Sequence, residues 1–598
     1  MEVKNRDEIP EQYHWDLASI FATDEVFLSA LEEARAYPGK CAAYQGKISQ
    51  SAQELLAYLR LDDEINVAMG RIFNYAQRKC DEDTRVSKYQ DFVSQAMSVY
   101  VAISSASAWF TPELLSLSEA QMAAFYAECP ELELYRRNLD RVFRRRAHTL
   151  SPAEEEALLA SAGDMASQPD NIYSMFGDAD LTFPDAVDAE GEKHPLTHGT
   201  FVPLLYSQDR VLRKSAFDAF YSVMRQFRNT CAAILNAQTK QLKFFADARK
   251  YPSTLAAALD TTEVPTEVYM NLVDAVRRNL PKMHKYTRLR RKLLGVDELH
   301  FYDLYVPIVG DVDMHFTYEE ACDLILKALE PMGEDYCNIV RQGLKQRWID
   351  VYENPGKRSG AYSAGGYSMH PFILLNFQGT LNDVFTLIHE MGHSMHTYLS
   401  CANQPSCYSE YVIFVAEVAS TCNEALLMQY LLKNTTDKRE RAYLINYFLE
   451  QFRTTLYRQT MFAEFELKAN QMTERGEGLT ADALCDIYRQ LNADYFGPDI
   501  VVDDEISLEW ARIPHFYYNY YVYQYSTGYA AAIALSQKIL SGGPEAVEHY
   551  LGFLKGGCSK PPIDLLRGAG VDMATAKPID DALTLFDSLL DEMDELMN

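Results

Sequence analysis

Cysteine is scarce in this chain of 598 residues, and the eleven cysteines that it has form no paired motif. They are odd in number, scattered along the sequence and without a CxxC spacing, which argues against a disulfide framework. Cys401 and Cys407 lie close together in the sequence, and we expect both to be unpaired thiols. The simplest interpretation is a protein with reduced cysteines, which we expect in the cytoplasm.

The chain also lacks apolar segments of the kind that target or anchor a protein. Its first residues, MEVKNRDEIP, contain no basic region followed by an apolar run, so we expect no secretory signal. The longest uncharged run, residues 513–537, holds Asn519, Gln524, Ser526, Thr527 and seven tyrosines. This composition predicts a buried helix that lines a site rather than a membrane span.

Positive charge is in short supply as well. The chain has 56 Lys and Arg against 85 Asp and Glu, a net charge of −29, which disfavours nucleic acid or an anionic membrane as a partner. It favours solubility and a preference for neutral or basic substrates. An apolar content of 48% with 24% charged residues is ordinary for a globular protein that forms a core.

The chain does contain an HExxH motif, His389-Glu390-Met391-Gly392-His393. On a helix, residues four apart lie on the same face, so His389 and His393 can direct one nitrogen each at a single metal ion. Zinc accepts imidazole nitrogen, and a catalytic zinc takes three protein ligands and leaves one position for water. Glu390 would flank that water as a general base and later as an acid, which points to hydrolysis of an amide bond.

The surroundings of the motif favour a metal site over a chance match, which would occur in roughly 1–2% of chains of this composition. Thr380 is a candidate N-cap, with Asp383 three residues further on. The two histidines are embedded in an apolar stripe rather than on a charged face. The stripe consists of Val384, Leu387, Ile388, Met391 and Met395.

A third ligand is needed, and spacing leaves several candidates. His396 shares the face of His389, but it would lie about 10 Å further along the helix, which would strain a tetrahedral site. We favour a carboxylate from the next predicted helix, residues 409–432, where an unpaired glutamate in a largely apolar run would be costly. Its glutamates recur every seven residues, at Glu410, Glu417 and Glu424. Spacing alone does not choose among these three.

Two sequence blocks, HEMGHSMH at 389–396 and FVAEVASTCNEAL at 414–426, resemble the oligoendopeptidase F family of thimet-oligopeptidase-like zinc metallopeptidases. The resemblance extends over residues 110–590 and implies one Zn²⁺ per chain. It implies that Glu417 is the third ligand and that Glu424 lies behind the ligands. His396 also belongs to the family's extended motif; we expect it behind the ligands or in the core, with direct ligation as the alternative.

The segment from residue 359 to residue 377, SGAYSAGGYSMHPFILLNF, breaks the helical pattern. Gly365 and Gly366 mark a loop that is flexible or allows close approach, and both are candidate substrate-binding positions. Residues 371–377 predict a strand. An edge strand beside the HExxH helix would let a peptide pair its backbone by β-augmentation; an ordinary core strand is the alternative.

The stretch RIPHFYYNYYVYQYSTG, residues 512–528, has six tyrosines in the nine positions from Tyr517 to Tyr525. A helix here would place Tyr518, Tyr521 and Tyr525 on one face, with His515 at its start. Such donors could stabilise a tetrahedral oxyanion, or the tyrosines could serve packing alone. The family resemblance implies a substrate-binding and oxyanion-stabilising set here. By that resemblance His515 and Tyr525 are candidate catalytic residues, and Tyr518 and Tyr521 are candidate substrate-binding residues.

Most of the remaining sequence shows the apolar periodicity of helices. We expect an N-terminal helical lobe at 1–110, a helical segment at 111–200 with a short β-hairpin whose turn is 188–191, and a catalytic domain at 201–590. Ser151 and Pro152 predict a helix start. The resemblance implies a mainly α, two-lobed, prolate body with a deep central channel and a small β-sheet next to the HExxH helix.

These observations predict a zinc-dependent endopeptidase that hydrolyses internal bonds of short oligopeptides, with broad specificity. The first alternative is a zinc carboxypeptidase or dipeptidase-type exopeptidase, which would need a cationic residue for the terminal carboxylate. The second is a non-catalytic helical peptide-binding protein, against which an intact Glu390 argues. Besides short peptides we expect no nucleic-acid or membrane partner, and we expect a monomer or a weak homo-oligomer.

Overall fold

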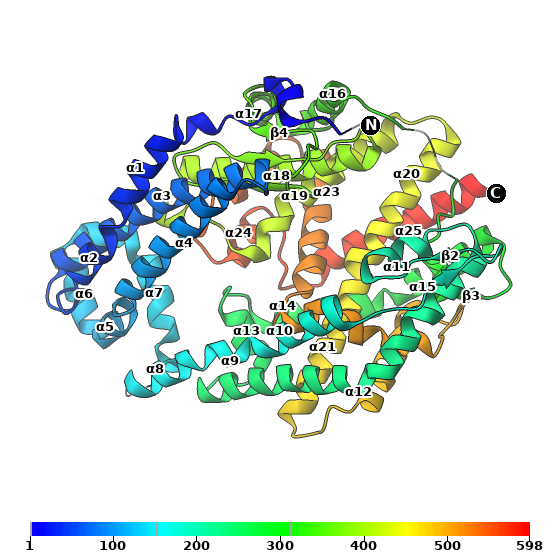
Figure 1. The fold of residues 1–598 in the computed structure, drawn as a ribbon, viewed down its shortest axis with the longest axis horizontal. Coiled ribbons are helices and arrows are strands. Elements are labelled where there is room, and N and C mark those ends of the chain that lie inside the picture. The colour runs from blue at the N-terminus through cyan, green and yellow to red at the C-terminus, as the bar shows by residue number, and fades with distance from the viewer. Residues whose placement is uncertain (1–2, 151–152, 311, 313) are drawn as a thin grey trace. The chain divides into compact units, whose positions relative to one another are not determined.

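The computed structural model describes residues 3–150, 153–310, 312 and 314–598. Most of them are helical, and the strands form only small sheets (Figure 1), which confirms the prediction of a mainly α fold. The chain divides into two compact units, each assembled from three stretches of sequence. Unit 1 comprises Met1–Thr149, Met314–Tyr430 and Leu535–Gly570; unit 2 comprises Leu150–Asp313, Leu431–Ala534 and Val571–Asn598. The predicted segment boundaries at residues 110 and 200 stay a prediction.

The first unit is built mainly from helices. Those that begin in it are α1 (Asp24–Ala34), α2 (Tyr37–Ala42), α3 (Ala52–Glu82), α4 (Ser87–Ser107), α5 (Phe110–Ser116), α6 (Glu119–Glu128), α7 (Arg136–Arg144), α16 (Tyr318–Ala328), α17 (Glu334–Lys345), α18 (Leu381–Asn403), α19 (Ile413–Asn434) and α24 (Pro562–Gly568). Helices α1, α3 and α4 pack around Phe27, whose ring centroid lies 5.2 Å from that of Tyr75 and 4.6 Å from that of Phe92.

A three-stranded sheet of unit 1 lies against α18. Strand β4 (Ile349–Asp350) pairs in parallel with β6 (Phe372–Leu374), and β5 (Tyr362–Ala364) pairs antiparallel with the other side of β6. The prediction of a small sheet next to the HExxH helix is therefore confirmed. The assignment of residues 371–377 to an edge strand is wrong, because β6 is the fully buried central strand. An unbroken apolar run is typical of a strand covered on both faces.

The N-terminal residues are tied to this sheet by buried charge. Arg6 pairs with Asp350 at 2.5 Å and with Glu82 at 3.0 Å, and the side chain of Lys357, which is 0% exposed, pairs with Asp350 at 2.7 Å. The main chain adds a bond from the Val351 N–H to the Tyr13 carbonyl at 2.9 Å. Buried ions need such partners, so these contacts hold the N-terminal segment against β4.

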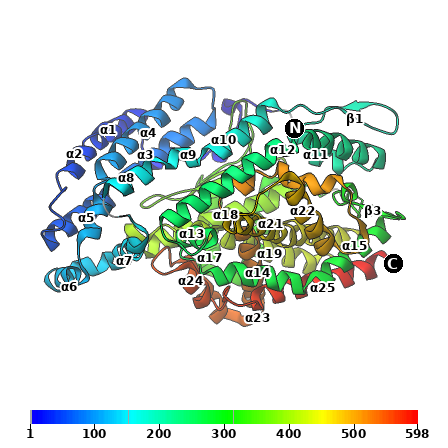
Figure 2. The ribbon, with the colours of Figure 1, turned by 90° about the horizontal axis from the view of Figure 1, so that it is seen from below.

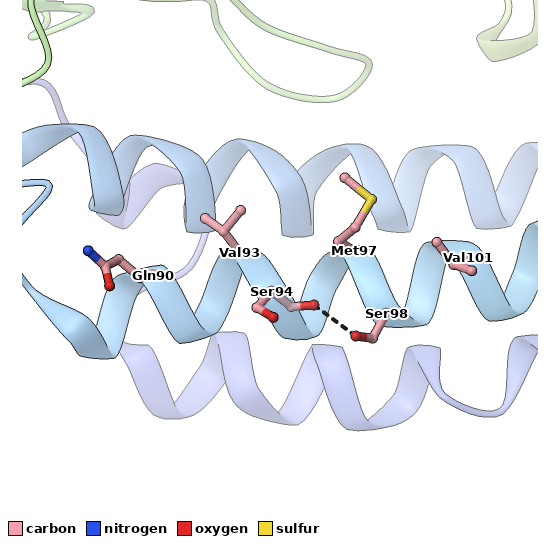
Figure 3. A pocket seen from close by; sticks show the side chains of 6 residues that line it. All are labelled: Gln90, Val93, Ser94, Met97, Ser98 and Val101. Carbon is pink, nitrogen blue, oxygen red and sulfur yellow. Dashed lines mark hydrogen bonds between the residues drawn. The ribbon is translucent and has the colours of Figure 1, made fainter. Parts of the chain in front are cut away.

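An open apolar pocket lies along α4 (Figure 3). Its lining residues recur every three or four positions, so they share one helix face; they are Gln90, Val93, Ser94, Met97, Ser98 and Val101, around a volume of about 620 Å³. The Ser98 hydroxyl donates to the Ser94 carbonyl of its own helix at 3.0 Å. None of the six side chains is titratable, so this pocket offers no groups for the predicted chemistry.

The second unit is organised around the long helix α12, which runs alongside α21 and α22 (Figure 2). The helices that begin in this unit are α8 (Ala153–Ser161), α9 (Gly163–Ala166), α10 (Gln168–Ser174), α11 (His198–Leu205), α12 (Arg210–Ala248), α13 (Thr254–Asp260), α14 (Thr266–Arg278), α15 (Leu280–Leu294), α20 (Lys438–Gln451), α21 (Arg458–Glu474), α22 (Ala481–Phe496), α23 (Tyr523–Leu554) and α25 (Lys577–Met597). Ser151 and Pro152 lie outside the described residues.

Two small sheets complete unit 2. The predicted hairpin is confirmed: β1 (Ala186–Val187) pairs antiparallel with β2 (Lys193–His194), and Asp188–Gly191 forms the turn between them. Strand β3 (Leu299–His300) pairs in parallel with β7 (Ile500–Val501).

All eleven cysteines are free thiols, as predicted for Cys401 and Cys407. Among the residues that the structure describes, no helix has both the length and the apolar composition that a membrane crossing requires.

Candidate metal centre

Helix α18 carries the HExxH motif and begins where its sequence predicts. The Thr380 hydroxyl accepts the Asp383 N–H at 3.2 Å, and the Asp383 carboxylate accepts the Thr380 N–H at 2.9 Å. This reciprocal cap satisfies two donors that the first turn would otherwise leave free. The predicted apolar stripe is buried: Val384, Leu387, Ile388, Met391 and Met395 are each 0% exposed. Core packing therefore fixes the direction in which the motif faces.

His389 and His393 converge on one carboxylate, that of Glu417 on α19. The Glu417 Oε2 atom lies 3.4 Å from the Nε2 of His389 and 3.6 Å from the Nε2 of His393. One possible ligand atom from each of the three residues lies within 4.8 Å of the others, the single such group among the described residues. The structure thus brings together the three predicted ligands.

The two separations between Glu417 and the histidines fit a zinc ion. Zinc binds imidazole nitrogen and carboxylate oxygen at about 2.0–2.2 Å, so two ligands of a tetrahedral site lie about 3.3–3.6 Å apart. The observed 3.4 and 3.6 Å are close to that value. A donor set of two nitrogens and one oxygen also leaves a fourth position open. The residues present therefore fit a zinc centre of the catalytic type.

Gly392, inside the motif, allows the two helices to come this close. A Cβ atom at Gly392 would lie 2.5 Å from the Ser420 Cα and 2.8 Å from the Ala419 carbonyl oxygen, both on α19. Such distances are far below van der Waals contact, so only glycine fits without a shift of the backbone. Sequence reasoning missed this role, although a glycine in the middle of a buried helix is a signal of close approach.

Glu424, two helical turns beyond Glu417, hydrogen-bonds to the other nitrogen of the His389 ring, Nδ1. This contact orients the imidazole so that Nε2 faces Glu417. The third candidate, Glu410, is exposed and lies outside the helix, because α19 begins at Ile413 rather than at the predicted residue 409. Upstream of Ile413, the Ser409 carbonyl accepts the Ser400 hydroxyl instead of a helical partner.

His396 is buried and lies outside the ligand group. Its ring stacks on that of Tyr411, with centroids 3.7 Å apart and planes 4° from parallel, and the Phe553 ring lies 5.2 Å away. Burial lowers the pKa of His396 to about 3, so the ring is neutral. The geometry places His396 in an aromatic layer rather than among the three convergent atoms.

Glu390 lies between the two histidines in sequence and is 7% exposed. Burial raises the pKa of its carboxyl group to about 7, and a hydrogen bond from the Ser363 backbone opposes that rise. Ser363 belongs to β5, so the sheet and the HExxH helix meet at this carboxylate. A buried glutamate with a near-neutral pKa is suited to accept and return protons.

The two histidines of the motif have different pKa values. Burial lowers the pKa of His393 to about 3, and the charge of His389 acts in the same direction. Burial would also lower the pKa of His389, but the hydrogen bond to Glu424 and the charge of Glu424 raise it to about 9. The neutral ring is the form that binds a metal through Nε2.

The glycine loop after β5 is tightly placed. A Cβ atom at Gly365 would lie 3.1 Å from the Cγ2 of Thr397 on α18 and 3.2 Å from the Cα of Pro371. At Gly366 the nearest atom would be the Met369 terminal methyl at 3.5 Å, an ordinary contact. Gly365 is therefore the position where the loop touches the motif helix.

In unit 2 the tyrosine-rich stretch forms a cluster, but not on the predicted continuous helix. His515 lies in the short 3₁₀ helix Pro514–Tyr517, Asn519 and Tyr520 adopt left-handed backbone angles, and α23 begins at Tyr523. Ring centroids are nevertheless close in a chain of contacts: His515–Tyr518 at 5.5 Å, Tyr518–Tyr521 at 6.4 Å, Tyr521–Tyr525 at 5.3 Å and His515–Tyr525 at 6.0 Å. A turn, rather than a helix face, brings these four side chains together.

Known protein families match most of the length of this chain. Residues 203–585 match the family model of peptidase family M3, and residues 113–183 match that of oligopeptidase F. Oligopeptidase PepF of Bacillus subtilis is 46% identical over 596 residues, which cover 100% of this chain and 89% of the relative.

Two crystal structures are similar to the whole chain. One, from Chlamydophila abortus, is 36% identical with a TM-score of 0.93 and covers 100% of both chains. The other, oligoendopeptidase F from Enterococcus faecium, is 40% identical with a TM-score of 0.74 and covers 97% of this chain and 99% of that one. The chain therefore belongs to peptidase family M3, as a metallopeptidase of the oligoendopeptidase F type.

Proposed function

We propose that this chain is a zinc-dependent endopeptidase that cleaves internal bonds of short oligopeptides. His389, His393 and Glu417 would hold the ion. A Zn²⁺ ion bound by these side chains would act as a Lewis acid that makes a water molecule more nucleophilic and polarises the scissile carbonyl. The observation that carries the proposal is the convergence of these three donor atoms beside the buried Glu390.

Glu390 is the proposed general base and general acid. Its carboxylate would accept a proton from the attacking water and later donate that proton to the departing amine. Both transfers are needed because an amide nitrogen leaves readily only after protonation. Burial and the Ser363 backbone hold this carboxylate in one place, which supports a role that depends on position.

His515 and Tyr525 are the proposed donors to the oxyanion, with Tyr518 and Tyr521 as substrate-binding neighbours. An imidazole N–H and a phenol O–H both donate hydrogen bonds, and donors arranged before the reaction stabilise developing charge most effectively. Two observations support this assignment: the 6.0 Å separation of the His515 and Tyr525 rings, and the similarity of RIPHFYYNYYVYQYSTG to the family's substrate-binding region.

The substrate backbone is proposed to pair with β5, and Gly365 and Gly366 to border it. Strand β5 pairs with β6 on one side, and no other described strand pairs with its second side. An edge strand recognises a peptide mainly through main-chain hydrogen bonds, which supports broad specificity. This assignment moves the predicted β-augmentation from residues 371–377 to Tyr362–Ala364.

The decisive experiment combines a substrate and a variant. A peptide acetylated at its N-terminus and amidated at its C-terminus should be cut internally, and a chelator should abolish the cleavage. An exopeptidase must bind a free terminus and would leave this peptide intact.

Glu390→Gln should retain the metal while kcat falls by about 10³-fold. Glu410→Gln, an exposed glutamate outside α19, is the matched control and should keep wild-type kcat. Wild-type activity in Glu390→Gln would remove the mechanism.

A further inference from the structure

A buried glutamate of unit 2 contacts the backbone of the tyrosine turn, which we define as residues 517–521. Glu466 on α21 is 3% exposed, and its Oε1 accepts the Tyr520 N–H at 2.6 Å. Its other oxygen, Oε2, is buried and has no hydrogen-bond partner among the described residues. A carboxyl group in such surroundings is costly, and an apolar side chain would fill the space without that cost. The one hydrogen bond that its carboxyl group makes among the described residues, with the Tyr520 N–H, therefore points to a role at the tyrosine turn.

The turn that it contacts has an unfavourable backbone. Asn519 has φ of 56° and Tyr520 has φ of 58°, so two consecutive residues with side chains lie in the left-handed region. L-residues other than glycine seldom adopt this region, and they keep it only where the surroundings impose it. The turn therefore needs contacts from outside itself.

Three neighbouring helices supply those contacts, and the three pack together (Figure 2). From α12, the Gln238 side-chain amide donates to the Tyr517 carbonyl at 3.1 Å and to the Asn519 Oδ1 at 2.8 Å. From α13, the Thr254 hydroxyl lies 2.8 Å from the Tyr520 hydroxyl. From α21, the Glu466 carboxyl group accepts the Tyr520 N–H, which belongs to the peptide bond between the two left-handed residues.

The shape of the turn decides where its flanking side chains lie. His515 precedes it and Tyr525 follows it, and their rings are 6.0 Å apart across it. If the backbone of residues 519 and 520 relaxed to right-handed angles, the direction of the chain between His515 and Tyr525 would change. A displacement of about 1 Å in a catalytic group can lower a rate by about 100-fold.

We propose that Glu466 is a positioning residue: by accepting the Tyr520 N–H, it holds the tyrosine turn in the conformation that sets His515 and Tyr525 as oxyanion donors. The inference rests on the proposed function of that pair. Glu466 itself does not touch the substrate and acts only through the turn.

The test separates the hydrogen bond from burial. Glu466→Gln keeps an oxygen acceptor for the Tyr520 N–H, whereas Glu466→Met has similar length and no acceptor. With a doubly blocked peptide, Glu466→Met should lower kcat by about 10- to 100-fold, with KM within threefold of wild type and metal content unchanged. Glu466→Gln should restore kcat to within threefold of wild type. A phosphinic peptide, which mimics the tetrahedral oxyanion, should lose affinity for Glu466→Met in parallel with kcat.

Glu464 provides the structural control. It also lies buried on α21, but it pairs with Arg277 at 2.6 Å instead of contacting the turn. Glu464→Met should lower the unfolding temperature and leave kcat unchanged. If it lowers kcat as much as Glu466→Met does, the effect is general destabilisation and the inference is overturned.

Two further outcomes decide the remaining cases. Wild-type kcat in Glu466→Met, or equal losses in the Met and Gln variants, would overturn the inference. If instead His515→Ala and Tyr525→Phe both keep wild-type kcat, the oxyanion proposal itself fails. If Glu466→Met does not fold, hydrogen exchange on the wild-type protein provides the test. The Tyr520 amide should exchange slowly. Exchange as fast as in an unfolded chain would contradict the hydrogen bond to Glu466 and overturn the inference.

Discussion

His389 is held from two sides by different glutamates. The Glu417 Oε2 faces its Nε2 at 3.4 Å, and Glu424 contacts its Nδ1. The Nδ1 contact keeps a proton on Nδ1, so Nε2 is the nitrogen that gives up its proton when the ring binds a metal. Two residues seven positions apart on α19 thus perform different tasks on one imidazole.

Removal of Glu424 should therefore weaken metal binding without removing a ligand. For Glu424→Ala we expect a 10- to 100-fold loss of zinc affinity, roughly the effect of deleting a partner behind a metal ligand. Competition with a fluorescent zinc chelator measures this affinity directly. Glu410→Ala serves as the control, and an unchanged affinity in Glu424→Ala would show that the His389 ring needs no second partner.

Residue spacing predicted some residues of this site and left others open. The HExxH spacing identified His389, Glu390 and His393, because two histidines four apart necessarily share a helix face. It could not choose among Glu410, Glu417 and Glu424, since a seven-residue repeat keeps all three on nearly one face. The choice depends on the crossing point of two helices: seven residues span about 10 Å of helix, so only one carboxylate can meet both Nε2 atoms. That crossing point is set by tertiary packing, which the spacing of residues in the sequence does not reveal.

At the scale of elements, the crossing of α18 and α19 depends on the absence of a side chain at Gly392. An added methyl group would lie 2.5 Å from the Ser420 Cα, and overpacking of this kind costs about 1–3 kcal/mol where the helices can shift. Gly392→Ala should lower both the unfolding temperature and the metal content, because a shift of α19 carries Glu417 away from the histidines.

Gly70 on α3 offers the matched control for that substitution. Its added Cβ would meet nothing within 4 Å, so Gly70→Ala should stabilise the helix by about 0.5–1 kcal/mol. Thermal unfolding and metal analysis of both variants compare the same change in two surroundings. Full metal content in Gly392→Ala would mean that the two helices tolerate a wider separation than the site requires.

Elements built from tyrosine were the least predictable. Helical periodicity placed Tyr518, Tyr521 and Tyr525 on one face, and the structure brings them together through a left-handed turn instead. Asn519 and Tyr520 adopt that turn because α12, α13 and α21 bind it. Local sequence contains no signal of such distant contacts. Strand β5 was missed for a similar reason, since three residues acquire a strand conformation only by pairing with β6.

The burial of Glu466 also predicts how the stability of the protein depends on pH. Burial raises the pKa of the Glu466 carboxyl from 4.5 to about 8, and the Tyr520 hydrogen bond only partly opposes this. The folded state therefore binds the proton more tightly than the unfolded state. The stabilisation that comes from protonated Glu466 is complete below pH 4.5 and is lost as the pH rises through 8. The facing groups Tyr269 and Tyr520 have pKa values raised far above 10, so they stay neutral in this window.

Glu466→Gln does not titrate, so its stability relative to wild type should increase from pH 5 to pH 9. Urea unfolding of both proteins at pH 5, 7 and 9 gives the two midpoints at each pH. The expected result is a difference that widens with pH, and a constant difference would show that the wild-type carboxyl group has an ordinary pKa.

At the scale of the whole molecule, the sequence predicted the helical class and the family. It did not predict how the chain divides into compact units. Each compact unit draws on three separated stretches, so sequence order alone could not assign residues to units. The central channel, the cytoplasmic location and the monomeric or weakly oligomeric state remain predictions.

The net charge of −29 predicts how the protein selects among peptides of equal length. Long-range fields raise the association rate of oppositely charged ligands, and salt screens them with a Debye length of about 30 Å at 0.01 M but about 3 Å at 1 M. We expect kcat/KM for a blocked peptide with three lysines to exceed that of its three-glutamate counterpart at 0.01 M salt. Raising the salt to 1 M should bring the two values together, because only the steering component is screened. A preference that persists at 1 M salt would instead assign the selection to short-range contacts within the site, and the total charge of the chain would then have no part in it.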